Sequence, residues 1–122
     1  MKQVIIKDKT FEFAVQIVEL YKRLHDTKKE YVLGKQLLRS GTSIGANTRE
    51  ALNAESKADF IHKLAIAQKE CDETIYWLEL LKESNFISSA EFDSYNSKAT
   101  EILKILRSII LTTKQNLITH NS

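Results

Sequence analysis

Two groups of basic side chains recur at helical spacing and could bind phosphate. The C-terminal stripe comprises Lys104, Arg107 and Lys114, spaced 3 and 7 residues apart, and the N-terminal stripe comprises Lys35, Arg39 and Arg49. Each spacing places its three cations on one flank of a helix. Such stripes suit the phosphate backbone of RNA or DNA without reading its sequence. The alternative is ordinary, solvated helix surface.

Other residue types that could carry chemistry lack the partners they need. No Ser or Cys has an identifiable His base for nucleophilic catalysis. The nearest metal pattern is Asp59-x-x-His62, but at about 100° per residue His62 lies opposite the apolar stripe of its helix and faces solvent. His25 and His120 have no partner at ligand spacing. We therefore predict no catalytic residue, no metal site and no cofactor.

Two glycines interrupt a segment that otherwise reads as helix. Gly41 and Gly45 lie within Ser40–Asn47, and each lowers helix stability by roughly 1 kcal/mol relative to Ala. The segment is not a phosphate loop, because the Gly-Lys-Ser/Thr ending and the preceding strand are missing. We expect the glycines to allow close helix packing, within a bundle or between subunits; a ligand-binding notch is the alternative. Asn47 is predicted on the seam of this helix, in a structural role.

Apolar periodicity predicts the elements that position these residues. Two stripes follow a seven-residue beat: Phe60, Leu64, Ala67, Cys71, Thr74, Leu78 and Leu81; and Phe92, Tyr95, Ala99, Ile102, Leu106, Ile109 and Thr113. An earlier helix carries a broad apolar arc: Phe11, Ala14, Val15, Ile17, Val18, Tyr21 and Leu24, extended by Phe13 and Leu20. Every such stripe must be buried against other helices.

Capping signals divide the chain into four helices. The first is predicted from about Asp8 to His25. Capping boxes at Thr27–Glu30, Ser56–Asp59 and Ser88–Glu91 start the others, which run to about Asn53, to about Glu83 and towards Leu117, with fraying at Thr119–Ser122. Short connections make neighbours antiparallel. We predict an all-α fold: an antiparallel up-down-up-down four-helix bundle, with residues 1–122 as a single domain.

Composition agrees with this assignment. The 122 residues include no Pro and three Gly, and the formal net charge is only +2. The charge is uneven: residues 50–93 carry ten acidic and four basic side chains, whereas residues 94–122 carry four basic and one acidic. The single Cys71 excludes an internal disulfide and is expected to be a buried hydrophobe. No apolar run reaches membrane-spanning length, so we expect a cytoplasmic protein that makes no membrane contact.

Surplus apolar residues predict contacts between subunits. Ile66 and Trp77 lie to one side of the main stripe of the third helix, and Tyr76 and Leu80 lie nearly opposite it. The fourth helix is apolar over too broad an arc for one seam, at Ile102, Leu103, Ile105, Leu106, Ile109 and Ile110. A lone bundle buries one stripe per helix, so we expect a homo-oligomer.

The segment Ser43-Ile44-Gly45-Ala46-Asn47-Thr48-Arg49-Glu50-Ala51, with Asp59–Glu70 and Glu73–Leu78, resembles the four-helix-bundle proteins encoded by intervening sequences within bacterial 23S ribosomal RNA genes. The accessory variability protein of diversity-generating retroelements is similar. The resemblance implies a four-helix subunit and a ring-like homopentamer. For the retroelement relative it also implies a basic surface that binds nucleic acid and a reverse transcriptase. It implies no enzymatic activity and supplies no functional residues.

The leading hypothesis is a non-enzymatic homo-oligomer, with a pentamer favoured, that binds structured RNA or DNA electrostatically. The alternative is a protein-interaction scaffold without nucleic-acid binding, whose partner is a polymerase or another protein. A third hypothesis, a small helical ribonuclease, requires Arg-x(4–6)-His, and no His follows Arg23, Arg39, Arg49 or Arg107 at that spacing.

Overall fold

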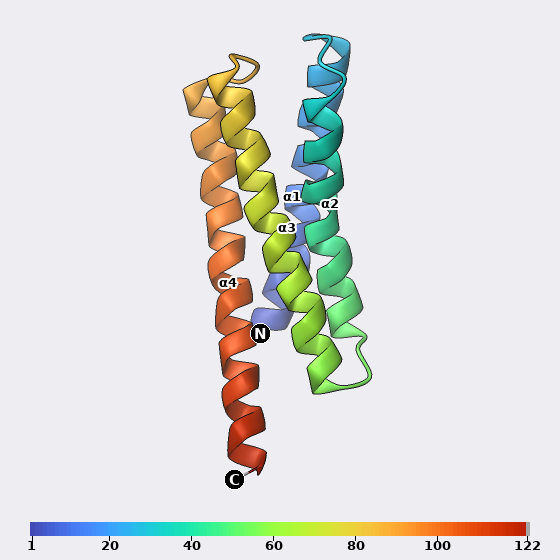
Figure 1. The fold of residues 1–122 in the computed structure, drawn as a ribbon, viewed down its shortest axis with the longest axis vertical. Helices are drawn as coiled ribbons and strands as arrows, with labels where there is room; N and C mark the ends of the chain where they lie inside the picture. The colour runs from blue at the N-terminus through green and yellow to red at the C-terminus, as the bar shows by residue number, and fades with distance from the viewer. Residues whose placement is uncertain (122) are drawn as a thin grey trace.

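The computed structural model describes residues 1–121, and the side chains of residues 1–118, as four helices (Figure 1). These are α1 (Lys2–Asp26), α2 (Leu33–Leu52), α3 (Lys57–Glu83) and α4 (Ser89–Asn121). They run alternately up and down. Helices α1 and α3 each pack against both α2 and α4, and neither diagonal pair is in contact. The predicted all-α, up-down-up-down bundle is confirmed, and the last turns of α4 project beyond the other helices (Figure 1).

The seams predicted for α3 and α4 form the core. In α3 every residue of the predicted stripe is buried except Phe60, which is half-buried; in α4 Tyr95 and Thr113 are half-buried and the rest are buried. The broad apolar arc of α4 is explained within the subunit, because Leu103 and Ile110 are also buried. A seven-residue beat keeps one stripe against neighbouring helices along the full length of the bundle.

Helix α1 starts earlier and faces differently than the sequence predicted. It begins at Lys2 instead of Asp8, and its buried stripe is Ile6, Thr10, Phe13, Ile17, Leu20 and Leu24. Phe11 and Val15, which were predicted within the packed arc, remain 53% and 42% exposed. The predicted centre of the arc was therefore wrong, because α1 packs on two neighbours and its third apolar side faces outward.

Helix α2 begins by a different device from the predicted capping box. Thr27 caps the end of α1, where its N–H donates to the Arg23 carbonyl. Lys29 then adopts a left-handed conformation with φ 56°. This turn carries Glu30 under α2, where its buried carboxylate accepts hydrogen bonds from the N–H groups of Val32, Leu33 and Gly34 at 3.1, 2.9 and 2.7 Å. Glu30 caps the helix from outside it, and α2 starts at Leu33.

The other two predicted helix starts are confirmed. The Ser56 hydroxyl accepts from the Asp59 N–H at 3.1 Å. Ser88 and Glu91 bond reciprocally, each backbone N–H donating to the other's side chain at 3.1 Å. Helix α4 continues to Asn121, past the predicted end near Leu117. The fraying predicted for Thr119–Ser122 and the side chain of His120 lie outside the described residues.

The glycines of α2 allow a close approach to α1, as the sequence predicted. A Cβ atom on Gly41 would lie 2.8 Å from Cγ2 of Ile17, and one on Gly45 would lie 3.3 Å from the Thr10 carbonyl oxygen. This approach rotates α2 so that Thr48 is buried. Asn47, predicted on the seam, is instead half-buried and donates to the Ser43 carbonyl of its own helix at 2.9 Å.

Candidate nucleic-acid interface

The C-terminal stripe stands open on the outer face of α4. Lys104, Arg107 and Lys114 are all exposed, and Leu111 between them is 59% exposed. Within the described residues, none of the three cations has an acidic partner at ion-pair distance. Their full charge is therefore available to an anionic partner from solvent.

The first turn of α1 adds a cation that the sequence analysis missed. Lys2 and Lys104 border a hollow of about 210 Å³ whose other lining includes Ile5 and Ile105. The ammonium of Lys2 donates to the hydroxyl of Ser108, which fixes the start of α1 against α4. The signal was present in the sequence, because Ile6 lies seven residues before Phe13 and extends the helical pattern back towards Lys2.

The N-terminal stripe is engaged within the subunit. The guanidinium of Arg39 pairs with Glu70 at 3.1 Å and, more closely, with Glu73, both on α3. The hydrogen bond to Glu73 raises the pKa of Arg39. A hydrogen bond from the Trp77 indole, together with Arg39, lowers the pKa of Glu73 against the opposing effect of burial. Arg39 is therefore largely neutralised where it lies.

Arg49 turns to the other side of α2. Its guanidinium carbon lies 5.2 Å from the centre of the Phe11 ring on α1, within the range of a cation–π contact. Lys35 is exposed and forms no ion pair with any described residue. One arginine of this stripe thus leans towards α3 and the other towards α1, so the spacing on α2 does not translate into one basic surface.

The structure does not bring the two stripes together. Helices α2 and α4 are diagonal in the bundle and make no contact, so their outward faces look away from each other (Figure 1). A single nucleic-acid segment cannot lie along both on one subunit. Of the six predicted residues, Lys104, Arg107 and Lys114 form one surface, whereas Lys35, Arg39 and Arg49 do not.

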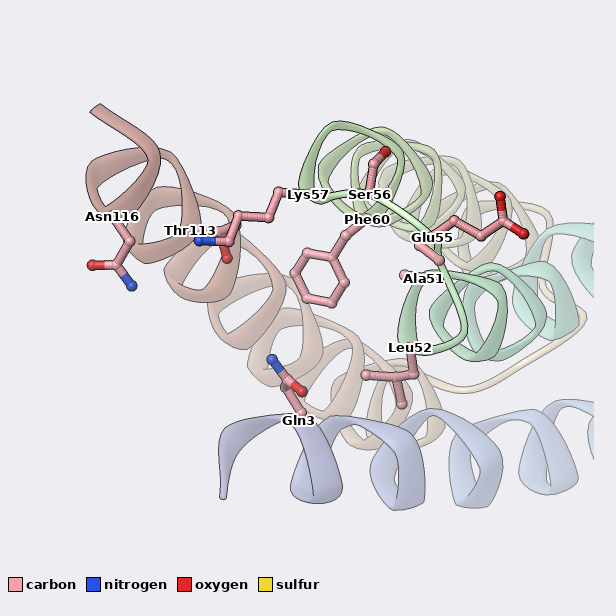
Figure 2. Close-up of a pocket in the computed structure, with 10 residues that line it drawn as sticks. Gln3, Ala51, Leu52, Glu55, Ser56, Lys57, Phe60, Thr113 and Asn116 are labelled. Carbon is pink, nitrogen blue, oxygen red and sulfur yellow. The ribbon is translucent and has the colours of Figure 1, made fainter. Parts of the chain in front are cut away.

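The end of the bundle near Phe60 contains a larger hollow, of about 430 Å³. Figure 2 shows the Phe60 ring pointing into it from α3, and Lys57 extending from the first turn of α3 towards α4. The lining also includes Gln3, Glu55 and Asn116. Glu55 offsets the charge of Lys57, so the hollow has no net attraction for an anion.

The reactive side chains are placed as inert structural groups. Cys71 is buried, with its sulfur 3.3 Å from the Ala99 carbonyl oxygen, and burial raises the pKa of its thiol to about 12. His62 is exposed, as predicted. No group of three or more His, Cys, Asp or Glu residues suited to a metal gathers in the described part of the chain. Among the described helices, none is both long and apolar enough to cross a bilayer.

Comparison with known proteins supports the fold and the family. A solved structure from Bacteroides thetaiotaomicron, described as a protein with unknown function from the S23 ribosomal protein family, is 58% identical to this chain. The alignment covers 90% of this chain and 98% of that one, with a TM-score of 0.90. No curated protein matches.

The sequence model of one family covers most of the chain. The family is described as 23S rRNA-intervening sequence protein, and its model matches residues 2–108, from the start of α1 to beyond the middle of α4. Neither this description nor that of the Bacteroides structure names an enzymatic activity. On the extent of this match, the chain belongs to the 23S rRNA-intervening sequence protein family.

Proposed function

We propose that the protein is a non-enzymatic, homo-oligomeric helical bundle that binds structured RNA or DNA electrostatically through the outer face of α4. The observation that carries the proposal is the C-terminal stripe: Lys104, Arg107 and Lys114 are exposed and have no acidic partner among the described residues. Phosphate contacts of this kind position a nucleic acid without selecting a base sequence.

Repetition of the stripe compensates for the modest charge of one subunit. A net charge of +2 gives little long-range attraction. An oligomer multiplies the open stripe by the number of subunits, and simultaneous contacts reinforce one another through effective concentration. The resemblance to family members that form rings favours a pentamer, and we expect it to act in the cytoplasm.

A salt titration tests the proposal. Binding of the wild-type protein to a structured RNA and to duplex DNA should weaken steeply as salt rises, because fewer counterions are released on binding. Lys104→Glu with Arg107→Glu should weaken binding to both polymers, while circular dichroism should show an unchanged fold, because both side chains are exposed. Wild-type protein that binds neither polymer at low salt would contradict the proposal.

A protein-interaction scaffold is the second candidate function. It is favoured by exposed aromatic and apolar side chains, notably Phe11 and Tyr76 at 53% and 56% exposure. Absence of nucleic-acid binding combined with a stable oligomer would favour this candidate. Light scattering at micromolar concentration measures the oligomer directly, and a stable monomer of 14.0 kDa would contradict both candidates as stated.

A further inference from the structure

The outer side of the α1–α2 pair contains an apolar groove of about 340 Å³. Ala14 lines it from α1, and Gly45 and Ala46 line it from α2. The groove exists because α2 approaches α1 closely at Gly45, where a Cβ atom would lie 3.3 Å from the Thr10 carbonyl oxygen. Small side chains on both helices thus leave room for a side chain from outside.

The rim of this groove is apolar, with one cation. Phe11 and Val15 are 53% and 42% exposed, although they lie on the same helix as fully buried core residues. The only charged side chain that lines the groove is Arg49, held over the Phe11 ring at 5.2 Å. Arg49 has no ion pair with any described residue. Adjacent exposed apolar groups of this kind mark interaction sites on soluble proteins, and the lone cation favours an occupant with acidic groups.

Helix α3 carries an aromatic side chain of matching character. Tyr76 is 56% exposed and stacks edge-on against Trp77, with ring centres 5.0 Å apart. The Trp77 indole donates to Glu73 at 3.2 Å, which holds the pair in place. Asp72 precedes Tyr76 by four residues and Glu79 follows it by three, so both flank it on the same helical face. Both acids are exposed and unpaired within the described residues.

We propose that the α1–α2 groove of one copy receives the Tyr76 face of α3 from a second copy. The inference rests on the homo-oligomer of the proposed function and names its interface. The pairing satisfies charge, because Arg49 meets Asp72 and Glu79, and it joins aromatic and arginine groups of the kind that dominate interface energetics.

The other exposed apolar side chains fit the groove less well because their neighbours are basic. Leu111 lies between Arg107 and Lys114, and Ile5 lies beside Lys2 and Lys104. Each would bring cations against Arg49. Outside the groove and its rim, Tyr76 is the exposed large apolar side chain of the described residues that has acids on both sides of it on its own helix face.

The two surfaces lie on different sides of the subunit, because α1 and α3 are diagonal and make no contact. One copy can therefore offer its groove to one neighbour and its Tyr76 face to another. Such a head-to-tail contact builds a closed ring when the rotation between copies closes. Neither surface uses the outer face of α4, so the C-terminal stripe remains exposed in the assembly.

Complementation between two inactive faces tests the inference. Phe11→Glu should disable the groove and Tyr76→Glu should disable the inserted face, so light scattering should find each variant as a 14.0 kDa monomer. An equimolar mixture should form a dimer and nothing larger, because one intact junction remains. Leu111→Glu is the matched control, since Leu111 is 59% exposed outside the junction, and its oligomer should equal the wild type.

Several results would overturn the inference. One is wild-type size in both single variants, and another is a mixture that stays monomeric. An assembly that survives Tyr76→Glu but not Phe11→Glu would show that grooves pair with each other. Should either variant fold poorly by circular dichroism, Arg49→Glu decides: it should weaken assembly, and adding Asp72→Lys with Glu79→Lys should restore it. An oligomer indifferent to these charges contradicts the inference. Monomeric wild type removes the proposed oligomer as well, whereas loss of nucleic-acid binding alone leaves the interface intact.

Discussion

Helices α2 and α4 carry basic stripes that look alike in sequence and behave differently in the fold. On α4 the cations Lys104, Arg107 and Lys114 stay exposed without acidic partners in the described part of the chain. On α2, Arg39 pairs with two glutamates of α3, and Arg49 lies over Phe11 of α1. The difference shows that spacing places side chains on a helix face, whereas neighbouring helices decide whether their charge stays available.

The two helices are also positioned by different means. Helix α2 is seated against α1 through glycines and begins under the buried carboxylate of Glu30. Helix α4 has no glycine and begins with the exposed pair Ser88 and Glu91, which bond to each other's backbone. Substitutions at these points can therefore break or sharpen the comparison.

The largest effect is expected where α2 meets α1. Gly41→Ala should destabilise the protein by about 1–3 kcal/mol through overpacking against Ile17, because the added Cβ would lie 2.8 Å from that side chain. Helix propensity alone predicts a gain of about 1 kcal/mol, so the sign separates the two effects. Gly34→Ala is the matched control, since its Cβ would meet its nearest neighbour at 3.4 Å. Urea unfolding decides, and a stabilised Gly41→Ala would contradict the close packing.

The next effect concerns the starts of the two helices. Glu30→Gln should destabilise the fold at neutral pH by about 1–2 kcal/mol, because Glu30 accepts three backbone N–H groups. Glu91→Gln should have a smaller effect, because Glu91 accepts one backbone N–H and its pairing with Arg23 is partly exposed.

The pH dependence of the Glu30 effect follows from its pKa. Burial alone would raise the pKa of Glu30, but the hydrogen bonds from Leu33, Gly34 and Val32 lower it overall. A folded-state pKa below the unfolded value gives stability that is present above the unfolded pKa, about 4.3 for glutamate, and is lost as pH falls through the folded pKa. The deficit of Glu30→Gln should therefore be full at pH 7 and disappear in acid. A deficit that grows as pH falls would contradict the cap.

The smallest effect tests whether the acids of α3 silence Arg39. Glu70→Gln with Glu73→Gln should free the guanidinium and raise nucleic-acid affinity modestly, by up to about 1 kcal/mol, the usual strength of an exposed ion pair. Glu55→Gln with Glu83→Gln changes the net charge equally at acids that do not pair with Arg39. The first variant should bind RNA more tightly than the second. Equal affinities would mean that only overall charge matters.

The sequence predicted the bundle well because its strongest signals are local and repeated. The stripes of α3 and α4 and the starts at Ser56 and Ser88 were found from spacing alone. The errors arose where tertiary contacts decide. The left-handed turn at Lys29 replaced the capping box, and the close approach at Gly41 rotated Thr48, in place of Asn47, into the core.

The candidate site was half predictable for the same reason. Helical spacing grouped Lys104, Arg107 and Lys114 correctly on one face. Nothing in the spacing of Lys35, Arg39 and Arg49 could reveal that acids on α3 and an aromatic ring on α1 lie beside them. Those partners are 31 or more residues away in sequence and become neighbours only when the helices pack.

The most direct test compares the two stripes by removing equal charge from each. Lys104→Gln with Arg107→Gln and Lys35→Gln with Arg39→Gln each remove two positive charges. RNA affinity should be measured across a range of salt concentrations for both variants and the wild type. The account predicts that the α4 variant binds more weakly and that its salt dependence falls by about 0.9 per lost phosphate contact on a duplex, while the α2 variant follows the wild type. Equal losses in both variants, or a larger loss from α2, would contradict the claim that α4 carries the interface.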